Sequence, residues 1–103
     1  MYMTETRVRH MVLFSLKHAE GSAESQAFLA DGYRLLRSIP GVQKLEVLKQ
    51  ISSKSDYDYA CSMEFDDQAA YELYSAHPTH ISFVNERFLV EVARFQEIDF
   101  VSC

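Results

Sequence analysis

The chain has 103 residues, of which 48% are hydrophobic and 24% are charged, a composition typical of one globular domain rather than a disordered chain. Ten Lys and Arg against fifteen Asp and Glu give a net charge of −5, which argues against nucleic-acid binding because phosphate recognition needs a basic surface. The sequence has no apolar stretch long enough for a membrane span, and only two cysteines, Cys61 and Cys103. Residues 1–5 lack the charged-then-apolar order of a secretory signal, so we expect no such leader. We therefore expect a single cytoplasmic domain over 1–103, with its core at about 8–100 and no nucleic-acid or membrane partner.

Residues 7–17 alternate in the way that β-strands do. One face of this strand would carry Val8, His10, Val12, Phe14 and Leu16. The opposite face is also apolar at its centre, at Met11 and Leu13. Since both faces need cover, we expect helices of the same chain on one face and a partner subunit on the other.

The next segments predict a helix followed by two strands. Ser22 is a suitable N-cap for a helix over 23–39, whose apolar stripe includes Phe28 and which ends at Pro40-Gly41. Residues 42–51 and 57–65 alternate as strands do. The second of these places large or apolar side chains on one face, among them Tyr59, Cys61 and Met63.

Two short helices and a last strand complete the chain. Asp66-Asp67 can cap a helix over 68–77 that Pro78 ends, and Thr79 can cap another from His80 to about Leu89. A strand over about 92–100 follows. The order β-α-β-β-α-(α)-β predicts an α+β, ferredoxin-like monomer with a four-stranded antiparallel sheet. Two such sheets packed face to face would form a dimeric α+β barrel.

Histidines and one tyrosine are the candidates for chemistry. His10 in the middle of an apolar strand face is either a hydrogen-bonded core histidine or a desolvated acid–base group. Tyr74 and His77 share a helix face, and His80 at the start of the next helix can be aimed back at Tyr74. A phenol beside an imidazole can donate to a carbonyl oxygen while the imidazole removes a proton. The spacing by itself slightly favours a simple corner between two helices, with the histidines on its surface.

A metal site is a weaker interpretation of the same residues. His77 and His80 offer two nitrogens, with no nearby cysteine and no HExxH pattern to complete a ligand set. His10 would have to supply the third ligand. We expect neither a metal nor a cofactor.

Four segments stand out: His10 to Lys17 (HMVLFSLK), Ile39-Pro40-Gly41-Val42, Tyr74-x-x-His77-Pro78-x-His80, and Ile98-Asp99-Phe100. Together they resemble the stress-responsive A/B barrel (Dabb) domain family, and the resemblance extends over about Val8 to Phe100. The resemblance implies a ferredoxin-like α+β monomer and a homodimer. Most members of this family have no assigned activity. One is a plant polyketide cyclase that closes a ring by an intramolecular aldol condensation without cofactor or metal.

The resemblance to that cyclase implies roles for single residues. Its acid–base pair matches Tyr74 and His80, with His80 as base and Tyr74 as oxyanion donor. Its first-strand histidine matches His10, whereas Tyr59 stands where the cyclase carries a further pocket histidine. The implied pocket for a small, largely apolar or aromatic ligand is lined by His10, Val12, Phe14, Phe28, Tyr59, Cys61, Met63 and His77, and Glu97 could also reach it.

Three functions remain compatible with the sequence. The first is a cofactor-free acid–base enzyme of the polyketide-cyclase or a related proton-transfer type. The second is a non-catalytic dimeric binding or stress-response module. The third is a cofactor-free oxygenase, by analogy with other dimeric α+β barrels.

Overall fold

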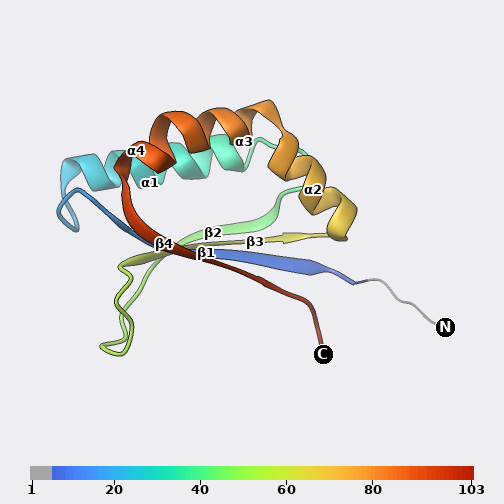
Figure 1. The fold of residues 1–103 in the computed structure, drawn as a ribbon, viewed down its shortest axis with the longest axis horizontal. Helices are drawn as coiled ribbons and strands as arrows, with labels where there is room; N and C mark the ends of the chain where they lie inside the picture. Colours follow the sequence, from blue (N-terminus) through green and yellow to red (C-terminus); the bar gives the residue numbers. More distant parts are fainter. Residues whose placement is uncertain (1–5) are drawn as a thin grey trace.

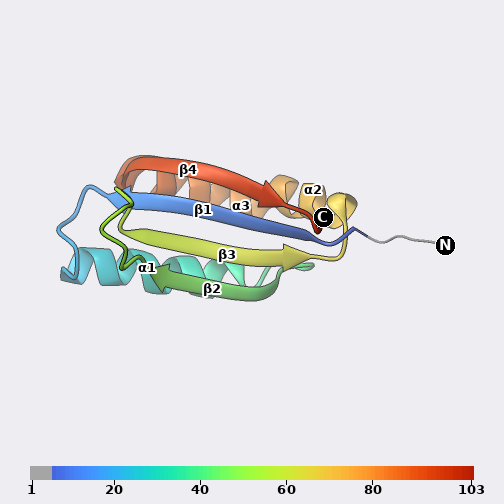
Figure 2. The ribbon, with the colours of Figure 1, turned by 90° about the horizontal axis from the view of Figure 1, so that it is seen from below.

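The computed structural model describes residues 6–103 and has the predicted element order. Its helices and strands are β1 (Val8–Leu16), α1 (Ala23–Leu36), β2 (Gln43–Lys49), β3 (Tyr59–Phe65), α2 (Gln68–Ala76), α3 (Pro78–Phe83), the π-helical turn η1 (Val84–Phe88), α4 (Leu89–Glu91) and β4 (Val92–Phe100). The strands form one four-stranded antiparallel sheet in the order β2-β3-β1-β4 (Figure 2). The predicted α+β, ferredoxin-like monomer is confirmed.

All the helices cover the same face of the sheet (Figure 1). Residues opposite one another in neighbouring strands point to the same face. His10 pairs with Met63 of β3 on one side and with Asp99 of β4 on the other, so these three side chains share the helix-covered face. The strand register therefore decides which polar groups of β4 lie under the helices.

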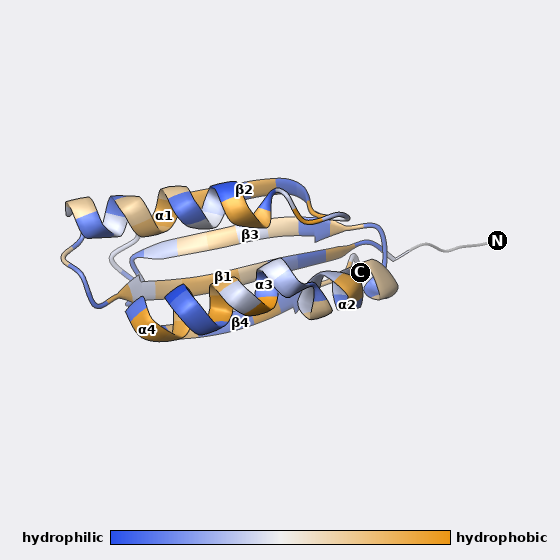
Figure 3. Ribbon diagram, turned by 90° about the horizontal axis from the view of Figure 1, so that it is seen from above, coloured by the Kyte–Doolittle hydropathy of each residue, from blue (hydrophilic) through white to orange (hydrophobic). Residues whose placement is uncertain are grey.

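The core lies between this sheet face and the helices. Phe65 and Met63 of β3 are 0% and 1% exposed, and Phe28 of α1 is 3% exposed. Phe28 on the apolar stripe of α1 packs on Phe14 of β1 and on Phe83 of α3. Hydrophobic and hydrophilic residues alternate along the helices in Figure 3. Gly32 lies on this stripe, where an added Cβ would come within 3.3 Å of the Phe83 ring. The absence of a side chain thus allows α1 and α3 to approach closely.

The structure corrects the expected corner between the two short helices. His77, and not Thr79, is the N-cap of α3, since its imidazole Nδ1 accepts from the Thr79 amide at 3.1 Å. Pro78 is the first residue of α3 rather than only the end of α2. Proline fits this position because the first helical amide needs no partner within the helix. The predicted cap was wrong because histidine is not among the usual N-cap residues.

Two further differences concern segment ends. The second helical segment continues beyond Leu89 to Glu91 and contains a π-helical turn over Val84–Phe88. The predicted strand over 42–51 ends earlier, since β2 stops at Lys49, and Ile51 beyond it is 92% exposed. Within residues 6–103, no helix has the length and apolar character to cross a membrane.

Candidate functional site

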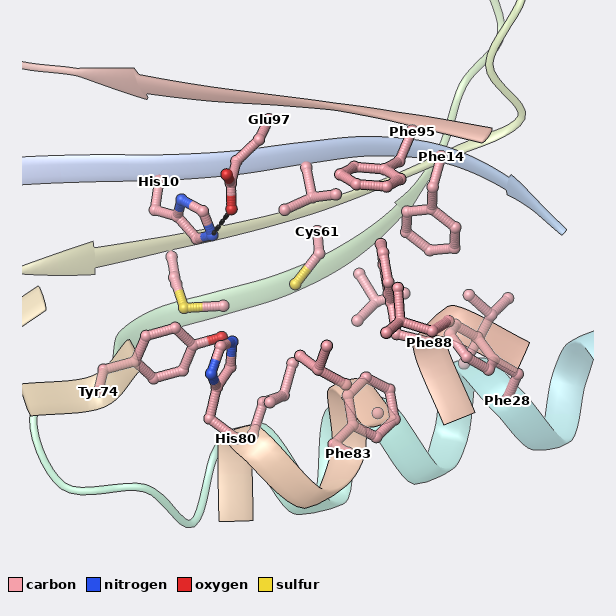
Figure 4. Close-up of a pocket in the computed structure, with 18 residues that line it drawn as sticks. His10, Phe14, Phe28, Cys61, Tyr74, His80, Phe83, Phe88, Phe95 and Glu97 are labelled. Atoms are coloured by element: carbon pink, nitrogen blue, oxygen red, sulfur yellow. Dashed lines mark ion pairs between the residues drawn. The ribbon is translucent and has the colours of Figure 1, made fainter. Parts of the chain in front are cut away.

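A cavity of about 280 Å³ lies between the helix-covered sheet face and the helices. All four strands and every helix contribute to its wall. Its polar residues gather at one end and its phenylalanines at the other (Figure 4). The lining residues are His10, Val12, Phe14, Phe28, Leu29, Gly32, Leu36, Val47, Cys61, Met63, Tyr74, His80, Phe83, Val84, Phe88, Leu89, Phe95 and Glu97.

Tyr74 and His80 meet in the wall of this cavity. Tyr74 belongs to the last turn of α2, and His80 to the first turn of α3, which starts only four residues later at Pro78. The corner at His77-Pro78 turns the second helix so that the two rings are 4.5 Å apart between centroids. In Figure 4 the hydroxyl end of the phenol lies beside the imidazole. The expected approach of His80 to Tyr74 is therefore observed.

The backbone fixes the protonation pattern of His80. Its Nδ1 lies 3.0 Å from the carbonyl oxygen of Ser75, and a carbonyl can only accept, so Nδ1 carries the hydrogen. In the neutral imidazole, Nε2 is then the nitrogen with a free lone pair. Burial lowers the pKa of His80 below 6.5, against a smaller opposite effect of the Ser75 carbonyl. At neutral pH His80 is therefore set up as a base.

Whereas His80 is a base, the phenol of Tyr74 is a hydrogen donor. Its residue is 2% exposed, and burial, reinforced by Cys61 and Tyr71, raises its pKa well above the usual value of 10. Tyr74 thus remains protonated across the whole physiological range. A buried, protonated phenol is a hydrogen-bond donor that can stabilise negative charge on a neighbouring oxygen.

His10 is held in place by a carboxylate. Its Nδ1 lies 2.6 Å from Oδ1 of Asp99, and the side chain is 4% exposed. Because a carboxylate only accepts, Nδ1 donates, and the orientation of the ring is fixed. Its Nε2 faces Glu97, whose Oε2 is 3.9 Å away (Figure 4). Tyr71 packs on the same imidazole at 5.0 Å between ring centroids, and burial together with the Asp99 charge raises the pKa of Tyr71 to about 12.

The other end of the cavity is aromatic and apolar. The rings of Phe14 and Phe28 are 5.9 Å apart, and those of Phe88 and Phe95 are 5.1 Å apart. Cys61 lies between the two ends, and burial raises the pKa of its thiol to about 12. This thiol therefore acts as an apolar wall and not as a nucleophile at neutral pH. The cavity suits a small ligand with an apolar body and one polar group.

The cavity brings together most of the side chains that the sequence singled out. His10, Val12, Phe14, Phe28, Cys61, Met63, Tyr74 and His80 all line it. Tyr59 and His77 are not among the lining residues. The Tyr59 ring packs 5.6 Å from that of Phe14, and its hydroxyl accepts from the Gly21 amide at 3.4 Å. His77 serves as the cap of α3.

Sequence reasoning missed the aromatic residues Phe83, Phe88 and Phe95 and the carboxylate of Asp99. The mixed pattern of residues 92–100 gave no clear face, but pairing this strand with residues 8–16 would have placed Asp99 opposite His10. Among residues 6–103, no group of three His, Cys, Asp or Glu side chains is arranged as a metal site would require.

Comparison with known proteins relates this chain to a family. The family model described as the stress responsive A/B barrel domain matches residues 8–102. A crystal structure of a Dabb family protein with a ferredoxin-like fold from Mesorhizobium loti is 49% identical, with a TM-score of 0.94, and covers 95% of this chain and 98% of that chain. Among curated proteins, none matches this chain.

Two less similar structures share the fold. A dimeric ferredoxin-like protein of unknown function from Thermobifida fusca is 17% identical, with a TM-score of 0.79, and covers 99% of this chain and 96% of that chain. The hydroxynitrile lyase from Passiflora edulis is 17% identical, with a TM-score of 0.82, and covers 94% of both chains. At this identity the likeness concerns the fold alone.

Proposed function

The chain belongs to the stress responsive A/B barrel domain family, and we propose that it binds a small, largely apolar or aromatic carbonyl compound and performs cofactor-free acid–base chemistry on it. The observation that carries this proposal is the contact between Tyr74 and His80 in the wall of an apolar cavity. One group is a base at neutral pH and the other remains a donor. Such a pair of opposite roles is what proton transfer next to a carbonyl group requires.

The reaction best suited to this pair is an aldol-type condensation. His80 Nε2 removes a proton from the carbon next to a carbonyl group, while the Tyr74 hydroxyl donates to the carbonyl oxygen that becomes an enolate. The enolate carbon attacks a second carbonyl carbon of the same ligand, which forms a C–C bond and an alkoxide. The proton on His80 then passes to that alkoxide, so no oxidant or other reactant is needed. A hydroxynitrile lyase with the same fold supports the idea that this scaffold can carry chemistry at a carbonyl carbon.

The first half of this reaction can be measured without the natural substrate. We expect the protein to accelerate hydrogen–deuterium exchange at the benzylic carbon of phenylacetone in D₂O, followed by NMR. His80→Ala and Tyr74→Phe should each lower the rate by about a hundredfold, the usual contribution of one acid–base or oxyanion group. His77→Asn is the matched control, because asparagine keeps a helix cap and His77 is not a lining residue.

The alternatives predict different results. A non-catalytic binding module would bind phenylacetone but leave exchange at the rate of the buffer in all four proteins. A cofactor-free oxygenase would instead consume dissolved oxygen with a quinol probe. Equal exchange rates in the wild type, His80→Ala and Tyr74→Phe would refute the proposed roles.

We further propose that two chains form a homodimer through the sheet face opposite the cavity. On this face Met11 pairs with Ile98, and Leu13 pairs with Ala60, which gives an apolar centre. The dimeric protein from Thermobifida fusca has the same fold. Leu13→Glu should convert the dimer to a monomer in sedimentation velocity, and an unchanged sedimentation coefficient would contradict this interface.

The cysteines fit a reducing compartment. Cys61 is buried, Cys103 is exposed, and neither is in a disulfide. We expect the protein to act in the cytoplasm.

A further inference from the structure

Glu97 is a charged residue on the cavity side of the sheet, where apolar residues are the rule. It lies opposite Val12 in the β1–β4 pairing, two residues from Asp99 and therefore on the same face. Its side chain lines the cavity and is 56% exposed. The carboxylate is thus reachable by water and by a ligand.

The Glu97 carboxylate and the Nε2 atom of His10 face each other across a gap. Asp99 accepts the hydrogen of His10 Nδ1 at 2.6 Å, and this contact holds the ring with Nε2 toward Glu97. Glu97 Oε2 is 3.9 Å from that nitrogen, which is too far for a direct hydrogen bond. In the described part of the chain the Glu97 carboxylate makes no hydrogen bond, whereas Asp99 does. A hydroxyl group of a ligand placed in this gap would donate to the Glu97 carboxylate.

The charges around the gap decide which ligand groups can enter. Glu97 and Asp99 are two carboxylates on either side of one imidazole. A ligand carboxylate would add a third negative charge and no donor, whereas a hydroxyl group adds a donor and no charge. At the other end of the cavity, the phenylalanine rings accept an apolar body.

We propose that Glu97, with His10, is a specificity-determining site that selects ligands with a hydroxyl group, such as phenols and enols, and rejects carboxylates. This inference rests on the proposed function only in that the cavity binds small aromatic compounds. Beyond the proposed function, the inference names the polar group that the ligand carries, a hydroxyl, and places this group beside β1 and β4. It requires no turnover.

The experiment compares three probes of nearly equal size: 4-propylphenol, 4-propylanisole and 4-propylbenzoate. Dissociation constants are measured from backbone amide shifts in ¹H–¹⁵N NMR spectra, which also report whether each variant is folded. The wild type should bind the phenol about tenfold tighter than the anisole, which lacks the donor, and should bind the benzoate most weakly. The variants are Glu97→Gln and Glu97→Ala, with Glu24→Gln on the exposed side of α1 as a charge-matched control.

We expect Glu97→Ala to bind the phenol and the anisole equally. Glu97→Gln should bind the benzoate about tenfold tighter than the wild type does, because the repelling charge is gone while the size is kept. Glu24→Gln should leave the order of the three probes unchanged. A phenol-to-benzoate preference that survives in both Glu97 variants would overturn the inference and leave the proposed function intact. If none of the three probes binds in the cavity, the inference and the proposed aromatic ligand both fail.

Discussion

The contact between His10 and Asp99 should contribute measurably to stability, because it satisfies a buried imidazole. Nδ1 and Oδ1 are 2.6 Å apart, the His10 side chain is 4% exposed and that of Asp99 is 43% exposed. Hydrogen bonds to charged groups contribute about 1.5–3 kcal/mol, and solvent near a half-exposed carboxylate weakens the interaction. We therefore expect a coupling free energy of about 1–2 kcal/mol between the two side chains.

A double-mutant cycle measures this coupling. The wild type, His10→Phe, Asp99→Ala and the double variant are unfolded in urea at one fixed protein concentration, because the stability of a dimer depends on concentration. His10→Phe keeps a ring that can pack on Tyr71. A second cycle of His10→Phe with Glu24→Ala is the control, since that pair should be additive. Additivity within about 0.5 kcal/mol for the His10–Asp99 cycle would refute the reasoning, because contacting residues normally couple more strongly.

Three further predictions concern the core, the thiols and His80. Phe65→Ala should lower the free energy of unfolding by about 3–5 kcal/mol, because Phe65 is 0% exposed; a loss below about 1 kcal/mol in urea unfolding would contradict its place in the core. Iodoacetamide should alkylate Cys103 but not Cys61 in the native protein, because burial raises the pKa of Cys61 to about 12. Alkylation of Cys61 in the native protein, detected by mass spectrometry, would contradict this. Burial lowers the pKa of His80 below 6.5, so the stability linked to this group is present above pH 6.5 and is lost as the pH falls through the lowered pKa. His80→Gln should therefore flatten the fall of the urea midpoint between pH 7.5 and 5.5, and a parallel fall in both proteins would count against the shifted pKa.

Much of the fold follows from local patterns in the sequence. Alternation in β1 predicts which side chains lie under the helices, and His10 and Phe14 are both buried there. The pattern is informative because a one-residue shift of the strand would turn its apolar side chains away from the helices. The order of elements then restricts the topology to a small number of folds.

The parts that were missed depend on contacts between distant segments. Asp99 and Glu97 belong to an edge strand, β4, whose exposed residues follow no simple alternation. Their place in the site follows only from pairing with β1. The cap of α3 was missed for a different reason. An imidazole can accept an amide hydrogen bond as well as a hydroxyl can, but histidine has too many other roles for sequence alone to predict this one.

The π-helical turn over Val84–Phe88 determines which residues of this helical segment line the cavity. Phe83 and Phe88 both line the cavity, and so do Val84 and Leu89, although a spacing of five residues does not bring two side chains onto one face of a regular α-helix. If the same residues adopted regular α-helical geometry, everything after the turn would be rotated by about 100° around the helix axis, the angle of one residue. Relatives of the same length but without this wide turn would consequently enclose a differently shaped space, even with the Tyr74 and His80 positions unchanged.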